Sequence, residues 1–401
     1  MRRLEVVVLS LSILSFLTGQ TPYNSILHGV VLDQLDAPSV SLGTTGLVPS
    51  HNSTVSLANP ATWTDLKFAF LSAHFSGGDV QVTSRDFNSE FGHLGYATFI
   101  VPIKGEFAGG LGLRPYSRKE FSLKDDSVDT VIFSGDTLTL SKELEGSGGI
   151  SSLFTAASWK IHENLTLGVR LEFLLGVFDE VTTTDLSETR AVYRRHFQYK
   201  GTMLSVFFRS TRFQPSMRST VHLGLQFPVG DRRILETDYH SYIAPVAKSP
   251  QKFALPVAVL GGWVYDLSPH THLSLEVLGR EFGDSSSLLN TLPGRSVRAS
   301  RAGLGLLREA VPGSRRLVDR LHYRVGFFRR QHYISRRESV LQESGWSLGI
   351  GISFGLTRNQ IDVGFRSSRR EGFLSNDIEH VREVIVGLTI GDVWFVRRTR
   401  R

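Results

Sequence analysis

Cysteine is absent from the 401-residue sequence. Disulfide bonds, thiolate metal sites, cysteine nucleophiles and a lipid-modified N-terminal cysteine are therefore all excluded. Methionine is scarce, with 3 residues, whereas phenylalanine and glycine are frequent, with 26 and 38. The glycines follow no three-residue period, so they do not indicate a collagen-like chain. A chain of this length usually holds two or three domains, but large barrels are an exception.

Long apolar runs are also missing beyond the N-terminus. Residues 4–17 form an apolar stretch, interrupted by Glu5 and several serines, after the basic pair Arg2 and Arg3. This arrangement is typical of a secretory signal peptide and is too short for a spanning helix. We expect a signal peptide at residues 1–20, with cleavage near its end; the alternative is an uncleaved anchor. No later stretch approaches about eighteen consecutive apolar residues, so any further membrane association cannot be helical.

Lysine is absent from the C-terminal part of the chain. From Gly294 to the end there are 21 arginines and 10 acidic residues, a net charge of +11, whereas the whole chain carries +7. Such a basic region can bind nucleic acid. A secretory signal and arginines scattered over many short segments argue against that partner. We expect instead that the arginines lie near membrane ends, against outer-membrane lipid or lipopolysaccharide head groups.

What dominates the chain is alternation of apolar with polar or small residues. Residues 165–177, 221–227 and 346–355 show it without a break. A period of two indicates half-buried strands, whereas helices repeat with a period near 3.6. We predict strands at residues 63–75, 92–103, 105–117, 147–161, 164–178, 195–209, 218–228, 253–267, 271–282, 297–309, 320–333, 344–356, 359–369 and 380–391.

These predicted strands are mostly about 10–15 residues long, enough to cross a bilayer when tilted, and soluble strands are usually shorter. The connections after even-numbered strands are short. Those after odd-numbered strands are mostly longer and polar, notably 118–146, 179–194, 229–252 and 283–296. Short turns that alternate with long loops are typical of an outer-membrane barrel with both termini in the periplasm. The sequence therefore predicts an all-β, 14-stranded antiparallel transmembrane β-barrel in the bacterial outer membrane.

Each strand of such a barrel has one face toward lipid and one toward the lumen. The apolar set, for example Leu223, Leu225 and Phe227, is expected to face lipid. Aromatic residues near strand ends are expected to form an interfacial girdle: Trp63, Trp159, Trp263, Trp394 and Phe395. The lumen-facing candidates are polar: Arg170, Glu172, His222, Gln226, His272, Glu276, Arg324, Asp362, Arg366 and Glu383.

Three stretches resemble the FadL/OMPP1/TodX-like outer-membrane transport proteins, including PorV-like relatives. "APSVSLGTTGLVPSHNSTVSLANPATW" resembles their N-terminal hatch, which carries Asn-Pro-Ala just before the barrel, here Asn59, Pro60 and Ala61. "GHLGYATFIVPIKGEFAGGLGLRPYS" resembles their glycine-rich second and third strands. "EHVREVIVGLTIGDVWFVRRTRR" resembles their closing strand and basic tail. Outside the Asn-Pro-Ala motif the hatch departs from the family, because "TGLVPSHNSTVSL" replaces the usual alanine- and aspartate-rich sequence.

The resemblance implies a signal peptide at 1–20, a hatch or plug at 21–62, a barrel at 63–395 and a basic tail at 396–401. It also implies passive uptake of a small hydrophobic ligand, either long-chain fatty acids or aromatics. Ligand would enter from the outer loops and leave through a gap in the wall. The alternative is a PorV-like accessory barrel that binds a secretion-system protein, for which the arginines of the tail are a candidate interface. Family members of both kinds share the fold, so the fold does not choose between them.

Two sets of residues are candidates for a site. Gly109, Gly110 and Gly112 would permit a kink or bulge in the wall; alternatively they only relieve crowding in the lumen. Arg170, Arg324 and Arg366 would grip a ligand carboxylate with paired N–H donors. Alternatively they form lumenal ion pairs with acids on the same faces: Glu172, Glu276, Asp362 and Glu383.

Catalytic signals are weak. Histidines and serines occur, but none has a recognisable nucleophile–base spacing, and "GGLGLRP" lies in a strand with no helix after it. No clustered metal-ligand spacing is present either. We therefore expect no enzyme activity, no cofactor and no metal.

Overall fold

The computed structural model describes residues 22–392, with gaps at 26, 28, 34–35, 84–86, 104, 134–135, 187–188, 212–217, 241–242, 253, 283–294, 312, 337–338, 356, 358 and 373–377. The 14-strand antiparallel barrel closes where β19 (Glu379–Asp392) pairs along its length with β2 (Ala69–Val82). Closure removes the two exposed sheet edges that an open sheet of this size would have. The predicted barrel fold is confirmed.

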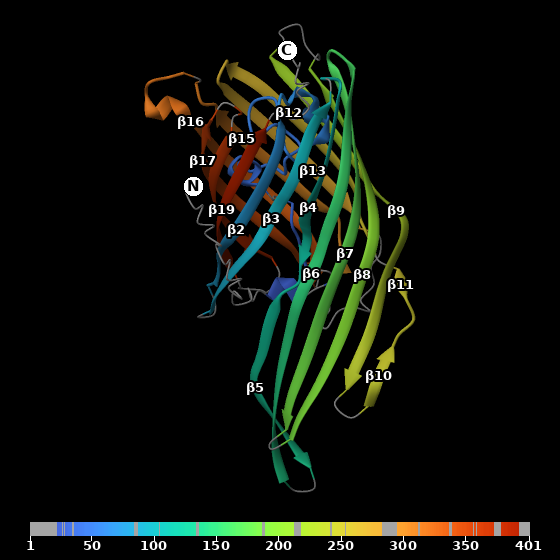
Figure 1. Cartoon of the computed structure of the whole chain (residues 1–401). Coiled ribbons are helices and arrows are strands. Elements are labelled where there is room, and N and C mark those ends of the chain that lie inside the picture. Colours follow the sequence, from blue (N-terminus) through green and yellow to red (C-terminus); the bar gives the residue numbers. More distant parts are fainter. Residues whose placement is uncertain are drawn as a thin grey trace, which may run out of the picture.

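The wall has an up-and-down topology, in which neighbours in sequence are neighbours in the sheet (Figure 1). The other wall strands are β3 (Phe87–Ile103), β4 (Phe107–Arg118), β6 (Asp136–His162), β7 (Leu165–Leu186), β8 (Thr189–Ser210), β9 (Ser219–His240), β12 (Val257–Ser268), β13 (Thr271–Glu281), β15 (Ala299–Arg308), β16 (Leu321–Arg336), β17 (Ser339–Phe354) and β18 (Asn359–Glu371). Further strands extend the sheet: β5 (Phe121–Phe133), β10 (Ile243–Ala247), β11 (Gln251–Lys252) and β14 (Arg295–Ser296).

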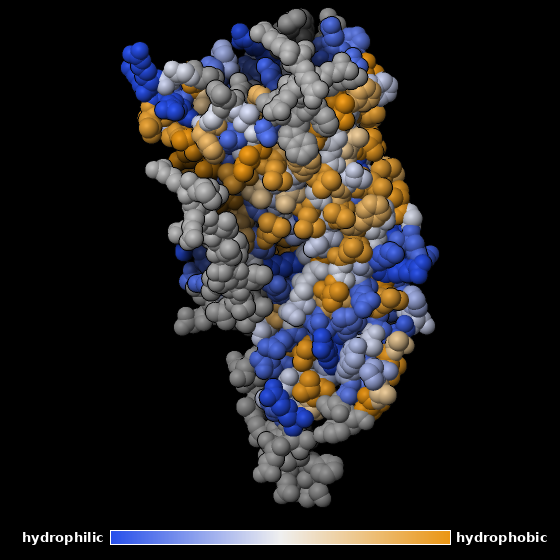
Figure 2. All heavy atoms as spheres, in the orientation of Figure 1, coloured by the Kyte–Doolittle hydropathy of each residue, from blue (hydrophilic) through white to orange (hydrophobic). Residues whose placement is uncertain are grey.

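A belt of apolar side chains surrounds the barrel. It forms the orange band across the upper part of Figure 2. Along β19, Val384, Val386 and Leu388 are exposed on the outer face, whereas Glu383 and Ile385 are buried on the inner face. An exposed apolar belt on a closed barrel is the surface that a bilayer requires. The chain is therefore an outer-membrane β-barrel, as the alternation predicts.

The two ends of the barrel differ in height. Short turns, such as residues 163–164 and 269–270, lie at the top of Figure 1, whereas β6 to β9 extend far below the belt. The stretches 118–146, 179–194 and 229–252, predicted as loops, are therefore mostly strand. That prediction was wrong because sheet outside the membrane has no lipid-facing side and needs no apolar alternation. In outer-membrane barrels the tall side is extracellular and the short turns are periplasmic.

The first wall strand begins later than predicted. Residues Pro60–Asp65 form the 3₁₀ helix η2, and β2 begins at Ala69. Trp63 is fully buried and donates from Nε1 to the Ser56 carbonyl at 3.1 Å, so it is not part of a girdle. Trp159 and Trp263 are exposed on the wall, as predicted. The remaining two girdle candidates, Trp394 and Phe395, lie outside the described residues.

The N-terminal segment, residues 22–66, lies against the inner face of the wall. It contains η1 (Pro22–Ser25), β1 (Val30–Val31), α1 (Ala37–Ser41) and η2. Asp36 caps α1 by accepting from Ser39 N at 2.9 Å. The helix α1 packs on β16 to β19, and η2 packs on β3, β4 and β6 to β8. The segment therefore bridges different arcs of the barrel.

Candidate functional site

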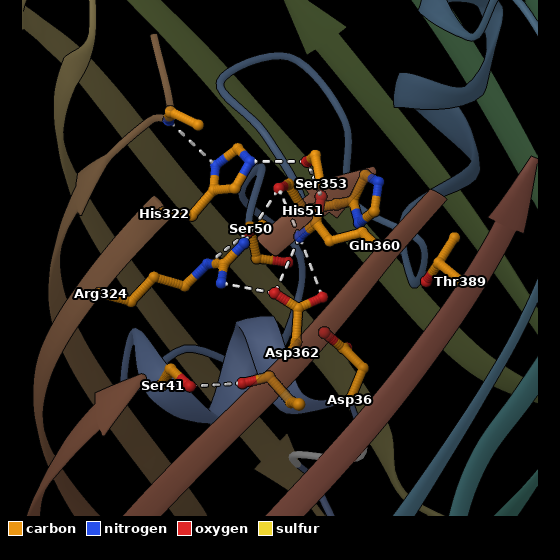
Figure 3. A network of polar contacts seen from close by, with 12 residues as sticks. Asp36, Ser41, Ser50, His51, His322, Arg324, Ser353, Gln360, Asp362 and Thr389 are labelled. Atoms are coloured by element: carbon orange, nitrogen blue, oxygen red, sulfur yellow. Dashed lines mark hydrogen bonds and ion pairs between the residues drawn. The ribbon is translucent and has the colours of Figure 1, made fainter. Parts of the chain in front are cut away.

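Arg324 is the centre of a polar network that joins β16 to the N-terminal segment (Figure 3). Its guanidinium donates to Asp362 Oδ1 at 2.8 Å, to the Ser50 carbonyl at 2.9 Å and to the His51 carbonyl at 3.0 Å. Gln360 donates to both Asp362 oxygens, at 2.8 and 2.9 Å. The Arg324 side chain is 0% exposed. An arginine that is buried and bound in this way fixes the segment to the wall.

His51 lies in the same network with its ring enclosed. Burial lowers the pKa of His51 to about 4, although the Asp362 carboxylate opposes that shift. His51 is therefore neutral at physiological pH, next to the Arg324 guanidinium. A neutral ring avoids a second positive charge at the contact between segment and wall.

The Asn-Pro-Ala motif packs on β7 and β9. Asn59 is the N-cap of η2, accepting from Ala61 N at 3.0 Å, and it donates to the Leu47 carbonyl at 2.6 Å. Its amide nitrogen also lies 3.5 Å from His222 Nδ1 on the wall. Pro60 is suited to the first helical position because that N–H has no helical partner. The motif therefore fixes the turn by which the chain leaves the lumen and joins the wall.

Arg170 connects the same region to β7. Its Nη1 donates to the Ala58 carbonyl at 2.9 Å, and its Nε lies 2.6 Å from Glu172 Oε1. Arg114 on β4 binds the other Glu172 oxygen at 2.8 Å. The third candidate arginine, Arg366, pairs with Glu383. These pairs agree with the ion-pair interpretation of the arginines; contact of any of them with a ligand stays a prediction.

Other polar anchors hold the middle of the segment. Glu276 on β13 accepts from the backbone N–H groups of Thr45 at 2.7 Å and Leu47 at 3.0 Å. Asp33 pairs with Arg280 and, at 3.0 Å, with Arg330. Burial alone would raise the pKa of Asp33, but these two guanidinium groups hold it below its usual range. The segment is thus bound through its backbone and through buried charges at several heights of the lumen.

Glycines on the inner face of the wall allow this close approach. A Cβ atom at Gly168 would lie 2.5 Å from Ala61 N, and one at Gly326 would lie 2.2 Å from the Leu42 carbonyl carbon. No side chain fits at such distances without displacing backbone. Further wall glycines make room for the segment in the same way: Gly262, Gly303, Gly305, Gly349 and Gly364.

The candidate kink residues lie in β4. The backbone pairing of β3 with β4 is continuous across them, from Ile103–Phe107 to Ala97–Leu113. A Cβ at Gly110 would lie 2.9 Å from the Trp63 ring, and one at Gly112 would lie 2.4 Å from the Phe154 ring. Gly109 faces open space, with only one atom near, at 3.8 Å. Gly110 and Gly112 therefore accommodate lumenal aromatic rings. Their role in a wall opening stays a prediction.

A break in the wall begins directly beyond these glycines. Past the Ala97–Leu113 pair, β3 pairs only with β2 in the described part of the chain, and β4 pairs through Ser117 and Arg118 with β1 of the segment. β5 then continues the line of β4 along β6. Figure 1 shows the lower end of β3 diverging from β4 and β5. We call this break the β3–β4 seam.

The seam starts inside the apolar belt, because Leu94 and Leu113 beside it are exposed on the outer face. A pocket of about 60 Å³ lies at the seam. Arg118 reaches across it: Nη1 is 3.4 Å from His93 Nδ1, and the guanidinium carbon is 5.5 Å from the Phe91 ring centre. Side-chain contacts thus join β3 and β4 where backbone pairing is missing. Arg366 is the one ligand-contact candidate among the pocket's lining residues.

A buried apolar cluster fills the extracellular side of the lumen. It packs residues of the segment, such as Tyr23 and Val31, against wall residues such as Phe178 and Phe197. Lys119 is enclosed here, with Nζ 3.9 Å from the Phe178 ring centre. Burial lowers the pKa of Lys119 to about 8. Its ammonium group has no hydrogen-bond partner among the described residues, so a cation–π contact is its main interaction.

Sequence reasoning identified some inward-facing charges, such as Arg170 and Glu172, but missed most of the buried ones, including Arg114, Arg301, Arg330, Glu343, Lys119 and Asp33. It also missed Arg118. Lys119 lies between strands, and Asp33 lies in the segment, so neither occupies a position that alternation marks. Arg118 ends β4 on its inner side, and its role depends on the strand that is missing beside it. A second lumenal pocket, of about 40 Å³, lies beside Arg170. No group of three or more potential metal ligands, and no helix long and apolar enough to span a membrane, occurs in the described residues.

Comparisons with known proteins agree with this architecture. A family model described as BamG matches residues 4–242. A search of curated proteins finds no match. Among solved structures, a Pseudomonas aeruginosa FadL homologue is 12% identical with a TM-score of 0.63, and the match covers 90% of this chain and 98% of that one. The CymD monoaromatic hydrocarbon channel gives 12% identity and a TM-score of 0.60, with the same two coverages.

The Pseudomonas putida toluene transporter TodX is also similar, with 12% identity, a TM-score of 0.55 and coverage of 90% of this chain and 99% of that one. At such identities the likeness concerns the fold. The predicted FadL-type barrel is confirmed at that level. By their descriptions, CymD is a channel and TodX is a transporter.

Proposed function

This chain belongs to the BamG family, and we propose that it is a barrel for passive uptake of small hydrophobic molecules across the outer membrane. The substrate class is long-chain fatty acids or simple aromatics. The support is twofold: a fold shared with channels described for hydrocarbons, and a wall break that opens beside the apolar belt. No catalytic step is part of the proposal.

The single observation that carries the proposal is the β3–β4 seam. A polar pore through the lumen would suit neither a hydrophobic solute nor the plugged interior, because buried ion pairs of Asp33 with Arg280 and Arg330 hold the segment in place. A break in backbone pairing that begins beside lipid-exposed Leu94 and Leu113 is the place in the wall where such a solute would pass sideways. The hydrophobic effect then favours transfer of the solute into the bilayer. In this scheme the N-terminal segment is a plug, and Arg118 closes the seam.

The test is a reversible cross-link across the seam. Because the chain lacks cysteine, His93→Cys with Arg118→Cys can be joined by a reducible bifunctional thiol reagent. A control pair, Val101→Cys with Gly109→Cys, joins the same two strands where they are already paired. Uptake of a fluorescent fatty acid or of toluene into proteoliposomes should stop on linking the first pair and return on reduction. Uptake that is equal for both linked pairs would refute the seam as the route.

A second candidate function is a secretion-accessory barrel that binds a partner protein. The observation that favours it is the small volume of the two lumenal pockets described above, about 60 and 40 Å³. Pockets of this size suit a scaffold better than a channel. Copurification of a partner that is lost on deletion of the tail 396–401, together with unchanged solute uptake on deletion of the whole protein, would favour this candidate.

A further inference from the structure

The turn between β15 and β16 is longer than the other periplasmic turns. Residues 309–320 form it, whereas β6–β7 and β12–β13 are joined by residues 163–164 and 269–270. It contains the 3₁₀ helix η3 (Leu317–Arg320), which projects sideways from the top of the barrel as the orange coil in Figure 1. The turn leaves the wall after the Arg308–Tyr323 pair of β15 and β16, just beyond the exposed apolar pair Leu306 and Val325 of the belt.

Asp319 gives the turn a defined conformation. Its carbonyl accepts from Val311 N at 2.6 Å, its carboxylate accepts from Arg308 at 2.9 Å, and Ser314 Oγ lies 3.3 Å from the same carboxylate. Ser314 Oγ also accepts from Arg316 N at 3.2 Å. The side chains of η3 are therefore presented by an ordered turn.

Those side chains divide into two chemical kinds. Leu317 is 69% and Val318 is 59% exposed, the first being the most exposed large apolar side chain of the described residues. Arg315, Arg316 and Arg320 are exposed as well. The one acidic group of η3, Asp319, is already paired with Arg308. The turn thus presents two apolar side chains and three arginines with no acidic partner within ion-pair distance in the described part of the chain.

The position of these groups matches a lipid surface. In Figure 2 the apolar residues at the upper left continue the orange belt, and hydrophilic residues lie above them. Side chains in that arrangement place the apolar pair at the boundary of the inner leaflet and the arginines among the head groups. Arginine gains most from such a position when the head groups are anionic.

We infer that η3 is an interfacial anchor that binds anionic phospholipid of the periplasmic leaflet, with Leu317 and Val318 inserted and Arg315, Arg316 and Arg320 contacting phosphate. The occupant is lipid rather than a protein partner, because the apolar pair continues a surface that is already in the membrane. The anchor fixes the rotation and depth of the barrel on the side of β15 and β16. It is independent of what passes through the barrel.

The absence of cysteine makes the test direct. A Leu317→Cys variant of the full chain is labelled with an environment-sensitive fluorophore and placed in lipid nanodiscs. Leu306→Cys on the belt is the lipid reference, and Glu106→Cys on the exposed β3–β4 turn is the aqueous reference. The label at 317 should emit close to the lipid reference and be quenched by lipids that carry a shallow quencher. Emission equal to that of the aqueous reference would overturn the inference.

The anionic preference needs a second comparison. Insertion at 317 should be deeper in nanodiscs that contain phosphatidylglycerol or cardiolipin than in pure phosphatidylcholine. Arg315→Gln, Arg316→Gln and Arg320→Gln together should remove that difference without changing emission from the belt reference. Insertion that does not depend on lipid charge, or a difference that survives the three substitutions, would refute binding of anionic lipid by the arginines.

Discussion

Replacement of Arg324 by methionine should release the N-terminal segment while leaving the barrel closed. Arg324 is fully buried and donates to Asp362 and to the carbonyls of Ser50 and His51. Methionine has a similar length but no donor. The Ser50 carbonyl then loses its Arg324 donor, the His51 carbonyl keeps only the Gln360 amide at 3.5 Å, and Asp362 also keeps only the Gln360 amide. Removal of one partner of a buried ion pair costs about 3–5 kcal/mol. The strands themselves keep their backbone pairing, so this cost falls on docking of the segment.

The expected size of the effect follows from that free energy. At about 1.4 kcal/mol per factor of ten, the population of the undocked segment should rise by roughly two to four orders of magnitude. Hydrogen exchange of the backbone amides around residues 47–51, followed by mass spectrometry, measures this change as lost protection. Ion conductance of the protein in a planar bilayer should rise as well, because water enters a lumen that the segment has left.

The matched control lies on the same strand. Arg329 faces outward on β16 and donates to Gln342 at 3.1 Å, so Arg329→Met removes an equal charge without touching the segment. Asp362→Asn added to the Arg324 variant should restore part of the protection, because it removes the carboxylate left without its cation. Equal exchange in the two arginine variants, or no recovery on adding Asp362→Asn, would contradict the assignment of Arg324 as the anchor.

Two further predictions concern buried positions. Gly168→Val should displace Ala61 and raise conductance, because a Cβ there would lie 2.5 Å from Ala61 N, whereas Gly261→Ala, whose Cβ would meet a side chain at 3.4 Å, should leave conductance unchanged. Burial lowers the pKa of Lys119 from 10.5 to about 8, so between these values the unfolded chain holds the proton that the folded chain has lost. Stability should then rise with pH by about 3 kcal/mol across that window. Denaturant unfolding in detergent should show this rise in the wild type and not in Lys119→Met; a rise that persists in the variant would assign it to another group.

Most of the wall was predictable because alternation is a local signal. The predicted strands 164–178 and 271–282 fall within one residue of β7 and β13 at their periplasmic ends. At the extracellular ends the signal fails, because the outer parts of β7 to β9 are held by neighbouring strands and not by an apolar face. The start of β2 was missed for a similar reason: Trp63 reads as an interfacial aromatic, but η2 carries it into the lumen.

The types of residue in the candidate site could be predicted from the sequence, but their arrangement could not. Some of the inward arginines and acids were identified by parity, and Arg170, Arg324 and Arg366 lie beside Glu172, Asp362 and Glu383. Others, such as Arg114, Arg330 and Glu343, were not identified. The seam was not predictable in its position, because it depends on which strands fail to pair. Nothing in the residues of β3 alone shows that its pairing with β4 stops at Ala97.

The fit between the wall glycines and the segment has a consequence for how the molecule is assembled. The residues that receive α1 and Gly43 lie on β15 to β19, about 260–350 positions further along the chain, whereas η2 is received by β3 to β8. The segment is synthesised first, but it has no surface to pack against until both groups of wall strands are in place and in register. Contacts of such long range form late in folding. The segment can therefore dock only on a barrel that has closed with the correct strands opposite each other.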